Sequence, residues 1–198
     1  LSLHEVGHTL GLSHNMHAST MLSPDELKDA DKVAENGMCN SVMEYPAINF
    51  TFNPEDLTLY YDDSPGPYDY WTIEYAYSIG LEDIDEENAR LEKILSKSNS
   101  PLLQFGNDAD DMRGSGKGVN PDVNIYDLSS DPVAYAAERC ELVNHLLPQI
   151  VEKHSELESS FEEVRSAYYY LTGEYAIQLR VMTRQIAGVR YDRSGPVN

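Results

Sequence analysis

Apolar residues recur every three or four positions over much of the chain, which is the period of an amphipathic helix. The pattern is most regular after residue 131, where it runs through Val133, Ala136, Ala137, Cys140, Val143 and Leu147. Pro148 should kink or end this helix because proline has no backbone N–H group. Two further helices are expected near residues 157–171 and 174–187, separated by Gly173, with buried faces at Phe161, Val164, Tyr168 and Leu171 and at Leu179, Met182 and Ile186. Residues 131–190 are therefore predicted to form a helical region, followed by a tail over residues 191–198.

Helix signals also divide the first hundred residues. The run Ser23-Pro24-Asp25-Glu26 has the order of an N-cap, a first-turn proline and a capping-box glutamate, and Gly37 is placed to end that helix. A helix rich in aromatic residues is expected over residues 68–79, and another is expected to begin at Asp85. Residues 57–61 suggest a short strand. The predicted fold class is mainly α.

The longest stretch without a helix pattern covers residues 105–130, which are rich in Gly, Asp, Asn and Pro. Asp108, Asp110 and Asp111 could bind calcium, since carboxylate oxygens on a flexible loop suit that ion. Their spacing matches no EF-hand loop, so a solvated loop is the preferred interpretation. A loop of this length could instead border a substrate cleft.

The first residues carry a metal-binding pattern, H-E-x-x-H-x-x-G-x-x-H. On a helix, His4 and His8 lie one turn apart on the same face and can bind one metal ion. Glu5 stands beside the first ligand, where its carboxylate can take a proton from a zinc-bound water. Gly11 permits the left-handed backbone conformation that ends the helix, so that the chain can return His14 as a third ligand. Three protein ligands leave one position open for water, which is typical of a catalytic zinc site. The alternative is a pair of surface histidines on an ordinary helix with an unrelated third histidine.

A second motif, Ser41-Val42-Met43-Glu44-Tyr45, follows some tens of residues later. Together the two motifs resemble those of the metzincin metallopeptidases, in the S-x-M-x-Y form of the astacin-like and serralysin-like branches. The resemblance implies a Zn²⁺ cofactor and peptide-bond hydrolysis, with Glu5 as general base. It implies that Met43 forms an apolar floor below the histidines without binding the metal, and that Tyr45 stabilises the oxyanion or approaches the zinc. Met43 considered alone would be interpreted as a core residue.

The resemblance narrows to a family of large bacterial metzincin-type proteases with extra domains before the catalytic core. It is carried by HEVGHTLGLSHN, SVMEYPAINF, GPYDYWTIEYAY and DPVAYAAERCELV. It implies that residues 1–104 form the C-terminal subdomain of a metzincin-like catalytic domain, with a helix packed behind the zinc site. It also implies a secreted, periplasmic or cell-envelope location. Asn15 is not the acidic residue, proline or serine that follows the third ligand in several metzincin branches, so their substrate preferences do not transfer.

Composition excludes some partners. The chain of 198 residues has 34 acidic and 14 basic residues and a net charge of −20, which disfavours binding to nucleic acid or to anionic membrane surfaces. No apolar run approaches the ~20 residues of a membrane span. Cys39 and Cys140 are interpreted as reduced, buried thiols, with a disulfide between them as the alternative.

The organisation of metzincins leads to one more expectation. Because that family places a twisted sheet and a supporting helix before the active-site helix, the chain is expected to be a C-terminal fragment of a larger protein. Its expected partners are a peptide or protein substrate and the upstream part of the same polypeptide. The isolated chain is expected to be inactive, to bind zinc weakly and to be prone to self-association through exposed apolar surface. The alternative function is a helical binding or scaffold module with a vestigial metal site.

Overall fold

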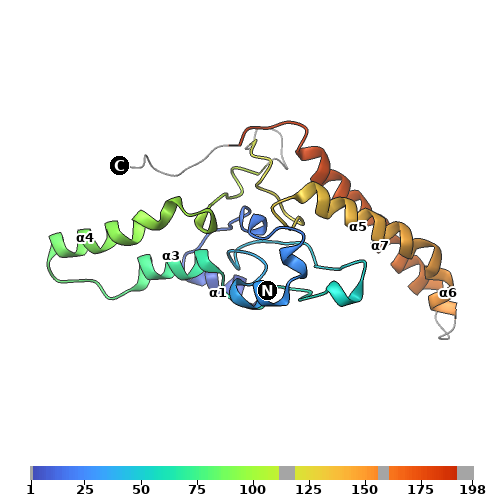
Figure 1. The fold of residues 1–198 in the computed structure, drawn as a ribbon, viewed down its shortest axis with the longest axis horizontal. Coiled ribbons are helices and arrows are strands. Elements are labelled where there is room, and N and C mark those ends of the chain that lie inside the picture. The colour runs from blue at the N-terminus through green and yellow to red at the C-terminus, as the bar shows by residue number, and fades with distance from the viewer. Residues whose placement is uncertain (1, 112–118, 156–160, 191–198) are drawn as a thin grey trace.

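Two helical arms extend from a central region of short helices and loops in the computed structural model (Figure 1). The structure describes residues 2–111, 119–155 and 161–190. Helices are the regular secondary structure in these ranges, and no β strand occurs in them. This confirms the mainly α fold and makes the strand predicted at residues 57–61 wrong. In its place, the 3₁₀ helix η3 (Pro54–Asp56) leads into an extended segment whose Tyr60 carbonyl accepts one hydrogen bond, from the Asn49 amide at 3.0 Å.

The central region begins with α1 (Ser2–Thr9), followed by η1 (Ala18–Thr20), η2 (Glu26–Lys28) and α2 (Ala30–Asn36). Its apolar core takes residues from this region, from the segment after residue 119 and from the first turn of α5. The core consists of Ala18, Leu22, Leu27, Val33, Met38, Cys39, Ala47, Leu128 and Tyr135. The core therefore joins segments that lie far apart in the sequence.

The capping box predicted at Ser23 is present, but the helix that it was expected to begin is shorter. The Ser23 amide and hydroxyl donate hydrogen bonds to the Glu26 carboxylate at 3.0 and 2.9 Å. The turn that follows is only the 3₁₀ helix η2. Asp29 then takes an extended conformation, and its side chain caps α2 by accepting hydrogen bonds from the amides of Asp31 and Lys32. Gly37, with a φ of 77°, ends α2 as predicted.

The first arm contains α3 (Pro67–Tyr77) and α4 (Ile84–Leu95), continued by η4 (Ser96–Asn99) and η5 (Pro101–Leu103) (Figure 1). These bounds match the two predicted helices, although Asp83 rather than Asp85 caps α4. Trp71 ties the two helices together because its indole N–H donates to the Ile94 carbonyl at 2.9 Å. Tyr68 stacks on Phe105 with the ring centroids 5.9 Å apart.

The second arm contains α5 (Pro132–Leu146), η6 (Leu147–Gln149), α6 (Ile150–Ser155) and α7 (Phe161–Arg184). Pro148 lies in η6, which confirms the break predicted there. Gly173 does not separate two helices: α7 passes through it without interruption. A glycine inside a helix costs only about 1 kcal/mol, and packing along α5 offsets this cost.

The buried face of α7 also differs from the prediction. Phe161 and Tyr168 are 93 % and 50 % exposed, whereas Gln178 and Val181 are buried. Polar contacts explain the difference, because the buried part of α7 includes Gln178, which donates to the Tyr126 carbonyl, and Glu174, which meets α5. Glu174 forms a salt bridge of 2.6 Å with the buried Arg139 of α5. Hydrophobic periodicity does not detect a helix face that is buried through such pairs. The tail predicted at residues 191–198 lies outside the described residues.

Residues 119–130, the later part of the predicted irregular stretch, contain no helix, as expected, but many of them are buried instead of solvated. Val123, Asn124, Asp127, Leu128 and Ser129 are all 0 % exposed. The backbone of this segment forms hydrogen bonds with two loops from the first fifty residues. The Asn124 amide donates to the Met16 carbonyl at 3.2 Å, and the Ala47 amide donates to the Asp127 carbonyl at 3.1 Å. It therefore supports the loops that carry both sequence motifs. Among the helices of the described ranges, none combines the length and apolar character needed to cross a membrane.

Candidate metal centre

The helix α1 and the turn after it bring three histidines together. His4 and His8 lie on α1, which ends at Thr9, and Gly11 takes a φ of 82°. The chain then reverses and brings His14 back beside the helix. The ring centroids lie 4.9 Å apart for His4 and His8, 4.8 Å for His8 and His14, and 5.3 Å for His4 and His14. Candidate ligand atoms of the three residues all lie within 4.8 Å of one another, so one metal ion can reach all three.

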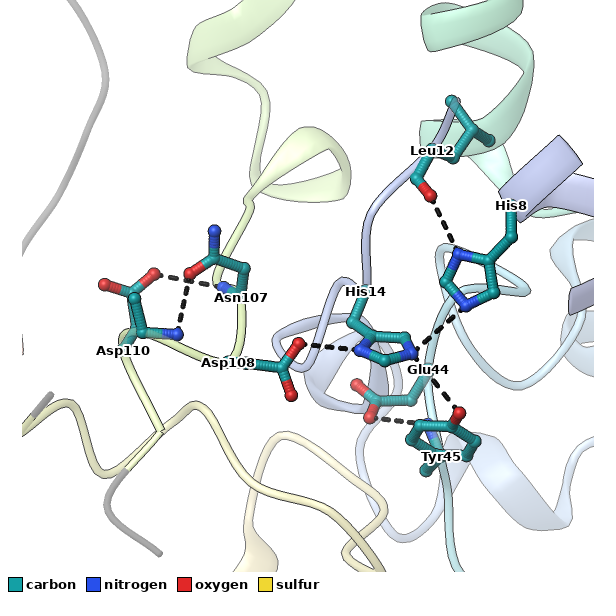
Figure 2. Close-up of polar contacts among 9 residues, drawn as sticks. His8, Leu12, His14, Glu44, Tyr45, Asn107, Asp108 and Asp110 are labelled. Atoms are coloured by element: carbon teal, nitrogen blue, oxygen red, sulfur yellow. Dashed lines mark hydrogen bonds and ion pairs between the residues drawn. The ribbon is translucent and has the colours of Figure 1, made fainter. Parts of the chain in front are cut away.

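Each of the three imidazoles is oriented by a hydrogen bond on the side away from this centre. His4 Nδ1 donates to the Val42 carbonyl at 2.8 Å, and His8 Nδ1 donates to the Leu12 carbonyl at 2.9 Å. His14 Nδ1 lies 2.6 Å from Asp108 Oδ2 (Figure 2). These acceptors favour the tautomer with the proton on Nδ1, which leaves each Nε2 with a free lone pair. Outer partners of this kind are typical of metal-binding histidines.

The inner nitrogens lie close together. With the protons on Nδ1, the Nε2 lone pairs of His8 and His14 face each other at 3.2 Å, an arrangement that a shared cation would stabilise. His4 Nε2 is buried and has no hydrogen-bond partner among the described residues. Burial lowers the pKa of His4, and the neighbouring imidazoles lower it further, so the neutral, metal-binding form is favoured. Neutral imidazoles that converge on one point fit the ligand set of Zn²⁺.

Met43 lies directly against the helix that carries the first two histidines. Its side chain is completely buried. A Cβ atom added at Gly7 would lie only 2.3 Å from Met43 Sδ, so the thioether occupies space that another residue at position 7 would fill. The Met43 carbonyl also accepts a hydrogen bond of 3.0 Å from the amide of Asn15, the residue after the third histidine. The two sequence motifs therefore form one packed unit.

A family model described as Met-zincin matches residues 1–196. The chain belongs to the Met-zincin family. No curated protein and no solved structure gives a match. The family match supports a metallopeptidase type of site, and it covers both helical arms of this Met-zincin chain as well as the three histidines.

Both predicted catalytic residues lie near the histidines. The Tyr45 hydroxyl is 3.2 Å from His14 Nε2 (Figure 2). The centroid of the Tyr45 ring is 4.6 Å from that of the His4 ring. Glu5 lies on the exposed side of α1 next to His4, and its negative charge acts to raise the pKa of that histidine. The structure thus places a hydroxyl and a carboxylate beside the Met-zincin histidines.

The Met43 turn is held by Asp69, which the sequence analysis did not identify. Asp69 lies in the first turn of α3 and is 4 % exposed. Its carboxylate accepts hydrogen bonds from the Ser41 hydroxyl at 2.6 Å, the Val42 amide at 2.8 Å and the Gly66 amide at 2.9 Å. Because the Val42 carbonyl orients His4, the start of α3 fixes the first ligand indirectly. The usable signal in the sequence was an acidic residue three positions after Gly66, where a capping residue is expected.

Glu44, the residue before Tyr45, and Asp127 are two buried carboxyl groups that lie close together. Ser19 links them, since its amide donates to Glu44 Oε2 and its hydroxyl donates to Asp127 Oδ1, both at 3.1 Å. Burial raises the pKa of Asp127 to about 6. Burial and the charge of Asp127 together raise the pKa of Glu44 well above its usual range. Asp127 Oδ2 has no hydrogen-bond partner among the described residues, so an ionised Asp127 is poorly solvated.

The three aspartates that were considered for calcium have other roles. Asp108 contacts His14, as described above. Asp110 and Asp111 are buried, at 4 % and 0 % exposed, so a solvated loop is the wrong description of this segment. Asp110 accepts a hydrogen bond from the Asn107 amide at 3.0 Å (Figure 2), and Asp111 lies 3.8 Å from the Arg184 guanidinium. Within the described residues, the three histidines are the one group of His, Cys, Asp and Glu side chains placed to bind a metal ion.

Both cysteines are free. Cys39 and Cys140 are buried and form no disulfide, in agreement with the preferred interpretation of the sequence. Burial raises the pKa of the Cys39 thiol well above its usual range, and the nearby carboxylates add to this effect. Burial also raises the pKa of the Cys140 thiol, so neither thiol has the character of a reactive cysteine.

Proposed function

We propose that the protein is a zinc-dependent metalloendopeptidase in which His4, His8 and His14 hold the metal ion. The observation that carries the proposal is the convergence of three Nε2 atoms whose rings are already oriented from behind. Membership of the Met-zincin family supports it independently. A pair of unrelated surface histidines would give neither the common centre nor the three hydrogen bonds at Nδ1.

The residues around the centre suit peptide hydrolysis. When bound, zinc supplies a Lewis acid that polarises a carbonyl group and lowers the pKa of water. In this proposal Glu5 accepts the proton of the attacking water and passes it to the leaving amine. We propose that the Tyr45 hydroxyl, which lies 3.2 Å from His14 Nε2, donates a hydrogen bond to the carbonyl oxygen of the scissile peptide as negative charge develops there.

A cavity of about 480 Å³ opens beside His4. Its walls include Leu3, His4, Val42, Tyr45, Pro46 and Ala47. Because His4 and Tyr45 border it, a substrate side chain in this cavity would lie next to the reacting peptide bond. The proposed substrate is therefore a peptide or protein, bound with one side chain in this space.

The outer face of α1 supports a further part of the proposal. Leu3, Val6 and Leu10 are 41 %, 52 % and 38 % exposed, and their spacing places them on one side of the helix. We infer that another part of the same polypeptide covers this face, as the metzincin resemblance implies. In the isolated chain the same face would favour self-association. The proposed location, secreted or in the cell envelope, rests on the family resemblance alone.

The test uses the complete protein and a peptide library, with and without a chelator. The E5A variant should lose turnover by several orders of magnitude while it retains stoichiometric zinc, because Glu5 is not a ligand. The H8A variant should lose both zinc and activity. Substantial cleavage by E5A would contradict the role of Glu5. Wild-type protein without stoichiometric zinc would favour the alternative, a helical binding or scaffold module.

A further inference from the structure

The third histidine differs from the other two in the group that orients it. His4 and His8 donate to neutral backbone carbonyls, whereas His14 meets the carboxylate of Asp108 at 2.6 Å. Asp108 lies 94 positions away in the sequence and belongs to the segment that follows the first helical arm. Figure 2 shows its side chain pointing to the outer edge of the His14 ring, opposite the edge that faces His8 and Tyr45.

Asn15 positions the segment that carries Asp108. This residue follows His14 directly and is completely buried. Its side-chain amide donates to the Gln104 carbonyl at 3.1 Å, and its side-chain oxygen accepts from the Gly106 amide at 3.1 Å. The Met16 amide donates to the Gly106 carbonyl at 2.6 Å. One short stretch of chain thus carries the third histidine and also binds the segment that orients it.

Gly106 allows this approach. A Cβ atom added at Gly106 would lie 2.4 Å from the Val123 side chain, which is itself completely buried. The segment therefore lies between Asn15 on one side and Val123 on the other. This packing restricts the backbone two residues before Asp108, so the contact with His14 does not depend on the half-exposed carboxylate alone.

We propose that Asp108 is the positioning residue of the third metal ligand, and that Asn15 holds the loop from which it acts. The inference rests on the proposed zinc site. The carboxylate fixes the His14 tautomer that directs the Nε2 lone pair to the common centre. Its negative charge also makes the imidazole a stronger donor to a cation. Loss of an outer partner of this kind typically reduces metal affinity 10- to 100-fold.

The test is the D108N variant of the complete protein, which keeps the size and an acceptor oxygen but removes the charge. D85N is the matched control, since Asp85 is exposed on α4 and loses the same charge. Zinc affinity is measured by competition with a chelator, and the ligand field is measured from the absorption spectrum of the Co²⁺-loaded protein. D108N should bind zinc about tenfold more weakly or worse and shift the Co²⁺ bands, with no change in the melting temperature of the metal-free protein. D85N should match the wild type in all three measurements.

Three results would overturn the inference. Wild-type affinity and an unchanged Co²⁺ spectrum in D108N would show that Asp108 does not act on the ligand. A lower melting temperature of metal-free D108N, with an affinity loss that D108E does not restore, would make Asp108 a structural residue. A wild-type protein that binds no zinc would remove the proposed function as well, so failure of the site and failure of Asp108 are distinguishable.

Discussion

The thioether of Met43 fills the space that a side chain at Gly7 would occupy. This contact joins the two motifs of the sequence, because Gly7 lies between His4 and His8 on α1 while Met43 lies in the turn below them. The buried Asn15 amide adds a hydrogen bond to the Met43 carbonyl. In the candidate metal centre, Met43, the helix α1 and the segment after His14 therefore contact one another directly.

The G7A variant tests this contact. Alanine at a helical glycine normally stabilises a protein by about 0.5–1 kcal/mol. At position 7 the new Cβ would overlap Met43 Sδ, so we expect a loss of about 1–3 kcal/mol in the free energy of unfolding, measured by urea denaturation of the metal-free protein. G173A is the control, since no atom within 4 Å would meet a Cβ there, and it should stabilise α7. Equal effects of the two substitutions would contradict the close packing.

Much of the candidate site could be predicted because its residues must be of particular chemical types at particular spacings. His4, His8 and His14 were found from the period of a helix and a glycine that ends it. The bounds of α3, α4 and α5 followed from local signals at their ends. Such features depend on neighbours in the sequence.

The features that were missed depend on contacts between distant segments. The sequence gives Asp69 only a local capping position and Asp108 only a possible calcium-binding loop, yet each one orients a part of the candidate metal centre from far along the chain. Residues 119–131 lack a periodic pattern, yet their central residues, such as Val123, Asn124 and Asp127, are buried, and the backbone of the segment bonds to the loops around residues 16 and 47. Gly173 failed as a helix break for the same reason, since packing against α5 outweighs a small local cost.

The buried pair of Glu44 and Asp127 should make stability depend on pH. Burial raises the pKa of Asp127 to about 6, above the ~3.9 of an unfolded aspartate. As pH rises from about 4 to 6, the unfolded chain loses this proton before the folded chain does, so the stability falls over that range. Burial raises the pKa of Asp127 although hydrogen bonds from Ser19 and Asn124 and the charge of Arg184 favour its ionised form. An ionised Asp127 in turn raises the pKa values of Glu44 and Cys39.

The D127N variant should remove this dependence. Asparagine keeps an oxygen for the Ser19 hydroxyl and replaces the unpartnered Oδ2 with a neutral group. We expect D127N to gain on the order of 2 kcal/mol over the wild type between pH 4 and pH 7, measured as the difference in unfolding free energy in urea. D85N should show no such change. Parallel pH profiles for D127N and the wild type would mean that Asp127 ionises normally in the folded protein.

The exposed face of α1 leads to the last prediction, which concerns residues 1–198 as an isolated chain. Leu3, Val6 and Leu10 present an apolar stripe beside the metal centre, and apolar patches of this kind promote association when nothing covers them. We expect sedimentation velocity to show concentration-dependent self-association that V6E reduces, because it places a charge at the centre of the stripe. F161E is the control: Phe161 is 93 % exposed at the start of α7, and the substitution adds the same charge elsewhere. If F161E reduced association as much as V6E, net charge would be the cause and the α1 face would not be the contact surface.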